Sequence, residues 1–157
     1  MDYSPLQRTG ILSLILENAK HLTDLKVISG MKKLENLELR GSGVSDLSSL
    51  TGNDTIKYLR IWDSPVTDLT PISSMKRLEY IDLINVPITT LKPLTANDGL
   101  EYISIVDTPV KDLSVLVKMP HLKKITLLDR ELKDLTIPEA LKSRIQLYGS
   151  LLDEDKK

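Results

Sequence analysis

A repeat of 22 residues runs through most of this 157-residue chain and constrains its fold more than any other feature. Regular copies begin at Leu34, Ile56, Leu78, Leu100 and Leu122. A looser copy begins at Ile11 with one extra residue, and a shortened last copy carries Ile145 and Leu147. A unit of this length cannot bury its own apolar face, whereas stacked units share one continuous core. The period therefore predicts a solenoid.

Apolar residues fill four columns when the copies are aligned. These columns are Leu37, Leu59, Ile81, Ile103 and Ile125; Leu39, Ile61, Leu83, Ile105 and Leu127; Val44, Val66, Ile88, Val110 and Leu132; and Leu47, Leu69, Leu91, Leu113 and Leu135. The first two columns come from the pattern L-x-L, which is typical of a short strand with alternate residues facing inward. Stacked copies then predict a parallel sheet of about seven short strands.

The repeat pattern resembles the leucine-rich repeat family. L-x-x-L-x-L is followed by a small polar residue, an apolar residue and D-L-x-P-L, and the segments "VTDLTPI" and "ITTLKPL" resemble the bacterial, internalin-like class with its 22-residue period. The resemblance covers residues 11–148. It implies an α/β solenoid, a right-handed superhelix with a concave parallel sheet and with short helical turns or loops on its convex side. It also implies a protein-binding scaffold.

One column departs from the family pattern, which usually places Asn after the strand to bond neighbouring backbone. This column reads Ser42, Ser64, Val86, Thr108 and Arg130. Ser and Thr can do part of that work, but Val86 and Arg130 cannot. We therefore predict a weaker ladder of polar contacts at these two positions.

Asp residues precede the "DL" leucine in most copies and suit the start of short helical turns. They are Asp24, Asp46, Asp68, Asp112 and Asp134, with Thr90 in the same column. A second polar column directly follows the strands: Gly41, Asp63, Asn85, Asp107 and Asp129. We interpret these as turn residues. The alternative is that Asp107 and Asp129 lie side by side and meet a basic residue of a partner.

Three outward columns face the open side of the predicted sheet. They are Ser13, Asn36, Tyr58, Tyr80, Tyr102, Lys124 and Arg144; Ile15, Glu38, Arg60, Asp82, Ser104, Thr126 and Gln146; and Glu17, Arg40, Trp62, Ile84, Val106, Leu128 and Tyr148. Four of the five tyrosines and the single tryptophan fall here, so the first and third columns form two apolar rails around a polar one.

Contiguous exposed apolar area marks interaction sites, and Trp, Tyr and Arg are enriched at binding hot spots. We therefore predict a partner-binding concave face. Its residues are Tyr58, Arg60, Trp62, Tyr80, Asp82, Ile84, Tyr102, Val106, Leu128 and Tyr148. Two alternatives stay open: aromatic cross-strand pairs that only stabilise the sheet, and a flanking domain or second copy that covers the patch.

Composition and motifs narrow the function to protein recognition. The net charge of −1 argues against nucleic acid or an anionic membrane as the main partner, and no apolar run is long enough for membrane insertion. The chain has no cysteine, and His21 and His121 lie about four repeats apart. No phosphate loop, nucleophile elbow or zinc-protease motif occurs. We predict no enzyme activity, no cofactor and no metal.

We expect one leucine-rich repeat domain over residues 1–157, with an N-terminal cap at 1–10, repeats at 11–137 and a C-terminal cap and tail at 138–157. The predicted function is a non-catalytic module that binds a protein partner. The alternative is a repeat domain excised from a larger multidomain protein, a secreted effector or surface protein, whose activity lies elsewhere. We predict a monomer, with self-association through the concave patch as the alternative. The N-terminus lacks the layout of a signal peptide, so the sequence indicates the cytoplasm as written, or secretion if such a peptide was removed.

Overall fold

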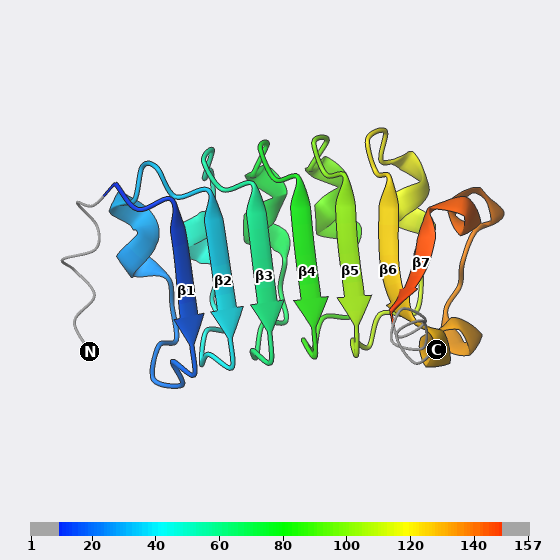
Figure 1. Cartoon of the computed structure of the whole chain (residues 1–157), viewed down its shortest axis with the longest axis horizontal. Coiled ribbons are helices and arrows are strands. Elements are labelled where there is room, and N and C mark those ends of the chain that lie inside the picture. The colour runs from blue at the N-terminus through cyan, green and yellow to red at the C-terminus, as the bar shows by residue number, and fades with distance from the viewer. Residues whose placement is uncertain (1–9, 149–157) are drawn as a thin grey trace, which may run out of the picture.

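The computed structural model describes residues 10–148 and places them in one open sheet of seven parallel strands, in chain order. Figure 1 shows the strands side by side, running from β1 to β7 along the long axis of the molecule. The strands are β1 (Ser13–Glu17), β2 (Asn36–Arg40), β3 (Tyr58–Trp62), β4 (Tyr80–Ile84), β5 (Tyr102–Val106), β6 (Lys124–Leu128) and β7 (Ile145–Tyr148). The predicted leucine-rich repeat solenoid and its seven strands are confirmed.

Short 3₁₀ helices connect the strands and cover one face of the sheet (Figure 1). They are η2 (Lys26–Gly30), η3 (Ser48–Leu50), η4 (Thr70–Ser74), η5 (Lys92–Ala96), η6 (Ser114–Lys118), η7 (Asp129–Asp134) and η8 (Glu139–Arg144). The opposite face, expected from the sequence to be concave, is called the open face below. No helix among residues 10–148 is long and apolar enough to cross a membrane. Residues 1–9 of the expected N-terminal cap and 149–157 of the expected tail lie outside the described residues.

The strands pair in the register that the 22-residue period dictates. On β3 and β4, Leu59 pairs with Ile81 and Ile61 with Leu83, and all four side chains are buried. The same pairing carries both inward columns through the core, which consists of aliphatic residues and methionines. Side chains of neighbouring repeats therefore pack against each other in one continuous core, as expected for a solenoid.

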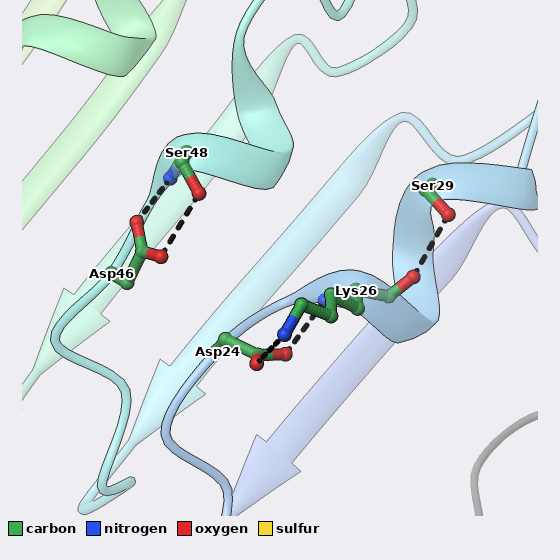
Figure 2. Close-up of polar contacts among 5 residues, drawn as sticks. All are labelled: Asp24, Lys26, Ser29, Asp46 and Ser48. Atoms are coloured by element: carbon green, nitrogen blue, oxygen red, sulfur yellow. Dashed lines mark hydrogen bonds and ion pairs between the residues drawn. The ribbon is translucent and has the colours of Figure 1, made fainter.

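The Asp column anchors the start of the helical turns, as predicted. Figure 2 shows Asp46 accepting hydrogen bonds from the backbone N–H and the hydroxyl of Ser48, at 2.7 and 2.9 Å, while Asp24 accepts the backbone N–H of Lys26 at 3.0 Å. Asp68, Asp112 and Thr90 make the same contact to the residue two positions on. Hydrogen bonds from the Thr70 side chain and backbone hold the pKa of Asp68 below its ordinary value. The prediction is wrong for Asp134, which lies at the end of η7 instead of before a helix.

Left-handed backbone follows the strands at the second polar column. Asp63, Asn85 and Asp107 have φ of 49°, 51° and 51°, and Gly41 has 58°. Asp, Asn and Gly are the residues that adopt this conformation at least cost. The turn lets the N–H of Asp63 reach the carbonyl of Ile84 on the next strand, at 3.0 Å. The turn interpretation of this column is thus confirmed for these positions.

The regular stack is interrupted between β5 and β6. Their pairing stops at Ser104 and Thr126, whereas β4 and β5 pair along five positions through to Ile84 and Val106. Residues 129–134 wind into η7 where the other copies make a left-handed turn. As a result, Leu132 and Leu135 are only partly buried at the edge of the core, which corrects their expected places in the inward columns.

The ladder of polar side chains is weaker at Arg130, as predicted. At Val86 the side-chain ladder is also broken, but the backbone pairing beside it is intact. Ser42 and Ser64 hydroxyls contact each other at 3.0 Å. Val86 is buried in the apolar core and breaks this side-chain ladder, but the β4–β5 backbone pairing beside it is complete. Arg130 is exposed and forms an ion pair with Asp107, so the basic residue that meets Asp107 belongs to this chain.

A carboxylate replaces the missing backbone pairs beyond Ser104 and Thr126. One oxygen of Glu131 accepts the N–H of Asp107 at 2.6 Å, and the other accepts the N–H of Leu128 at 2.8 Å. The equivalent N–H of Asn85 bonds the carbonyl of Val106 on the adjacent strand. Glu131 therefore bridges β5 and β6 across the point where their ladder opens.

Truncation of a central inward side chain should destabilise the stack. Leu83 is fully buried on the central strand, so Leu83→Ala leaves a cavity and should lower the free energy of unfolding by about 2–5 kcal/mol. Urea denaturation followed by circular dichroism measures the change, with the exposed Thr89→Ala as control. A midpoint equal to that of the wild type would contradict the inward assignment.

Removal of the bridging carboxylate should open the β5–β6 junction. Glu131→Ala leaves two backbone N–H groups without acceptors and should cost about 1–3 kcal/mol, while Glu131→Gln keeps one acceptor oxygen and should cost less. Amide hydrogen exchange should accelerate at Asp107 and Leu128 and stay unchanged at Asp63, which bonds a carbonyl. Unaltered exchange at both amides would show that Glu131 does not hold the junction.

Candidate binding site on the open face of the sheet

The open face carries the outward columns in the predicted order. Tyr58, Tyr80 and Tyr102 pair in register across β3, β4 and β5, and Trp62 pairs with Ile84 at the far end of the strands. Tyr58 and Tyr102 are 40% and 37% exposed, so their rings are accessible to a partner. The structure brings these predicted residues together; their role in binding stays a prediction.

One of the predicted residues, Val106, differs from the expected exposed rail. Val106 is only 4% exposed and offers a partner almost no area, so the exposed rail is wrong at this position. Its strand end lies where β5 and β6 separate, but Val106 still pairs in register with the outward residue Ile84 and is not part of the inward core. Leu128 is half-buried, and Tyr148 pairs with Leu128 at the end of β7.

The tyrosines form a continuous row of tilted rings. The ring centroids of Tyr58 and Tyr80 are 6.4 Å apart, and those of Tyr80 and Tyr102 are 6.3 Å apart, with interplanar angles of 43° and 35°. Aromatic pairs at such separations attract each other beyond their buried area. The row therefore stabilises the sheet and also presents a firm aromatic surface.

Two arginines lie over aromatic rings of the same face. The guanidinium of Arg40 is 4.4 Å from the ring centroid of Trp62, and that of Arg60 is 5.1 Å from the centroid of Tyr80. Both arginines also pair with Glu38, a buried acid on β2 and the register neighbour of Arg60. The sequence analysis placed Glu38 and Arg40 in the outward columns but left them out of the predicted site. Their position beside the aromatic rails was the available signal.

A hollow of about 470 Å³ lies on this face and extends from β3 to β7. The residues around it that bear on its chemistry are Arg60, Trp62, Tyr80, Asp82, Ser104 and Lys124. Of these, the sequence analysis missed Ser104 and Lys124, because the hollow depends on how the last strands separate. A second hollow of about 220 Å³ lies between Ile105, Leu127 and η7, at the interrupted junction.

Asp82 occupies the floor of the larger hollow. It is 5% exposed, and its Oδ1 atom has no hydrogen-bond partner among the described residues. Burial raises the pKa of this carboxyl above its ordinary value of 3.8, while the neighbouring Ser104 and Trp62 side chains and the charge of Arg60 offset part of the rise. Trp62 also has a buried indole N–H without a partner within hydrogen-bonding geometry among these residues.

The sequence matches no protein-family model and no curated protein sequence. Its fold is shared with solved internalins of Listeria monocytogenes. InlF aligns with a TM-score of 0.59 at 19% identity over 87% of this chain, and the functional domain of InlJ with a TM-score of 0.64 at 16% identity over 94%. This chain spans 46% of the InlF chain and 35% of the InlJ chain. The InlJ domain includes a cysteine ladder, whereas this chain has no cysteine.

The comparisons therefore establish the class of fold: a leucine-rich repeat solenoid with the architecture of the internalins. The likeness at these identities extends to the fold. Among residues 10–148, no group of three His, Asp or Glu side chains is placed to hold a metal ion. What this chain does must be argued from its own open face.

Neutralising the buried carboxylate should stabilise the fold at neutral pH. Because the pKa of folded Asp82 is raised, the native state binds more protons than the unfolded state between pH 3.8 and that raised value. Stability contributed by this group is therefore greatest at low pH and is lost as the pH rises. Asp82→Asn should melt at higher temperature than the wild type at neutral pH, and the difference should shrink as the pH is lowered toward 3.8.

Thermal melts across this pH range measure the effect, with Asp98→Asn, an exposed turn position, as the matched control. The control should follow the wild type at every pH. A variant Asp82→Asn that is less stable than the wild type at neutral pH would show that the ionised carboxylate is fully compensated within the chain.

Proposed function

We propose that this chain is a non-catalytic recognition module that binds a protein partner through its open face. The main support for this proposal is the location of the aromatic residues. The core of the described residues contains no aromatic ring, whereas Tyr58, Trp62, Tyr80 and Tyr102 all lie on the open face. Tyr, Trp and Arg dominate the energetics of protein interfaces, so this surface has the composition of a hot spot.

The rigidity of the surface supports the same proposal. The rings pack against one another and against Arg40 and Arg60, so little side-chain freedom remains to be lost on binding. The strands beneath them are fixed by parallel pairing on both sides. A preorganised aromatic surface with a polar centre suits a folded protein partner, and the fold is that of the internalins InlF and InlJ.

A repeat domain within a larger protein is the second candidate, and one observation favours it. The edge strand of the sheet, β1, has two exposed apolar residues. Leu12 directly precedes it and is 58% exposed, and Ile15 lies on it and is 54% exposed. Stacked repeats cover such residues with a further repeat or a cap. In this case the module would contribute partner recognition to a protein whose other activity lies in another domain.

Site-directed photo-crosslinking tests the proposed face. A benzophenone amino acid at Tyr58 or at Tyr102 should capture the same protein from extracts of the source organism, because both side chains are exposed on the open face. The same amino acid at Thr95 or Lys118, on the helices that cover the other face, should not capture it. Capture from the helical positions alone would overturn the proposal.

Substitution of the exposed rings then measures their share of the affinity. Tyr58→Ala with Tyr102→Ala should leave the free energy of unfolding within about 1–2 kcal/mol of the wild type, since both rings are partly exposed. The affinity for the captured protein should fall by about 2 kcal/mol or more if these rings form the hot spot. Calorimetric titration of the purified pair gives the number, and unchanged affinity would place the interface elsewhere.

A further inference from the structure

We propose that the hollow on the open face receives a basic side chain of the protein partner, arginine or lysine, with Asp82 as its counter-ion. This inference rests on the proposed function, because it names the chemistry by which that partner is held. It concerns one pocket residue and one class of side chain, so it can fail while the open face is still the interface.

Asp82 is buried and, within the part of the chain that the structure describes, has an unpaired carboxylate oxygen. Its carboxylate lies on the central strand β4, is 5% exposed and has an oxygen without a hydrogen-bond partner among residues 10–148. A buried polar atom without a partner costs free energy, and such atoms are uncommon in folded proteins. Asp82 lines the hollow, so a donor that enters the hollow from outside can reach it.

Comparison with the other buried acid on this face shows that Asp82 lacks a close ion pair in the described part of the chain. Glu38 is 3% exposed, and its two oxygens face Arg40 and Arg60, the latter at 3.9 Å. Asp82 has no ion pair within 4.0 Å among the described residues. Among residues 10–148, Glu38 thus has two arginine partners within 4.0 Å, whereas Asp82 has only the more distant charge of Arg60, its neighbour in register on β3.

The walls of the hollow suit a cation. Trp62 and Tyr80 line it, and each already has a guanidinium over its ring, from Arg40 at 4.4 Å and Arg60 at 5.1 Å. Rings of this kind attract cations through the negative charge of their faces. Arginine combines a planar, weakly hydrated group with five donors, so it can stack on a ring and bond Asp82 at once.

The opposite assignment, in which an acidic side chain of the partner binds Lys124, has less support from the structure. Lys124 also lines the hollow, but it lies on β6, two strands and about 10 Å from Asp82. Its side chain is more exposed than that of Asp82, so water screens its charge. The desolvated carboxylate on the floor gains more from an opposite charge than a hydrated ammonium group at the side does. The upward shift of the Asp82 pKa by burial agrees with a charge that the chain compensates only in part.

A peptide selection provides a probe that does not require the partner to be identified first. Random heptapeptides displayed on phage are selected on the wild-type protein and, in parallel, on Asp82→Asn. Peptides selected on the wild type should be enriched in Arg or Lys, and this enrichment should be absent for Asp82→Asn. Enrichment in Asp or Glu that depends on Lys124 would overturn the inference.

Titration of the strongest selected peptide then tests the contact itself. Trp62 is the only tryptophan of the chain and lines the hollow beside Asp82, so its fluorescence reports on binding there. Asp82→Asn should weaken binding at least tenfold, and so should replacement of the peptide arginine by the neutral isostere citrulline, or of its lysine by norleucine. The two changes together should cost little more than either alone. The control Asp98→Asn should bind like the wild type.

The outcomes separate this inference from the proposed function. If Tyr58→Ala with Tyr102→Ala abolishes peptide binding while Asp82→Asn preserves it, the open face is the interface and the counter-ion assignment is wrong. If no peptide is selected, the inference about a basic side chain fails, whereas the proposed function stands or falls with the crosslinking at Tyr58 and Tyr102.

Discussion

The stacking of identical inward positions in neighbouring repeats is the constraint on which the whole molecule depends. Each strand contributes two aliphatic side chains to the core and three residues to the open face, and a shift by one residue would exchange the two sets. Leu59 over Ile81 and Ile61 over Leu83 show how strictly the register is kept. Because aliphatic residues fill this narrow core, the aromatic rings remain on the outer surface, where they define the candidate site.

Most of the fold could be predicted from the sequence because the relevant signals are local and repeated. L-x-L specifies a strand wherever it occurs, and Asp two residues before a helical turn accepts the same N–H in nearly every copy. The exception after β6 could be predicted only in part. Arg130 was recognisable as a poor ladder residue. Glu131 accepts the amide of Leu128 three residues back, a local contact at the start of η7, but it also accepts the amide of Asp107 after β5, a tertiary contact that no local pattern encodes.

The candidate site was predictable in outline and not in detail. Strand alternation alone placed Tyr58, Trp62, Tyr80 and Tyr102 together on one surface. It could not reveal that Val106 is buried, or that Glu38 has two ion pairs while Asp82 has none within 4.0 Å among the described residues. Those properties depend on side-chain directions across several strands. A buried acid with an oxygen that lacks a partner is the kind of local cost that proteins accept where they bind something.

The interrupted junction between β5 and β6 also limits how the molecule can be lengthened or shortened. Between β2 and β5 each repeat meets identical neighbours, so a designer can insert or delete 22 residues and expect the core to close again. Beyond Ser104 and Thr126 that freedom ends, since Glu131 is built to join two particular strands. The hollow reaches from β3 to β7 and includes this junction. Insertion or deletion of a repeat between β3 and β5 would therefore change the hollow, whereas the solenoid can vary in length before β3 without altering its lining.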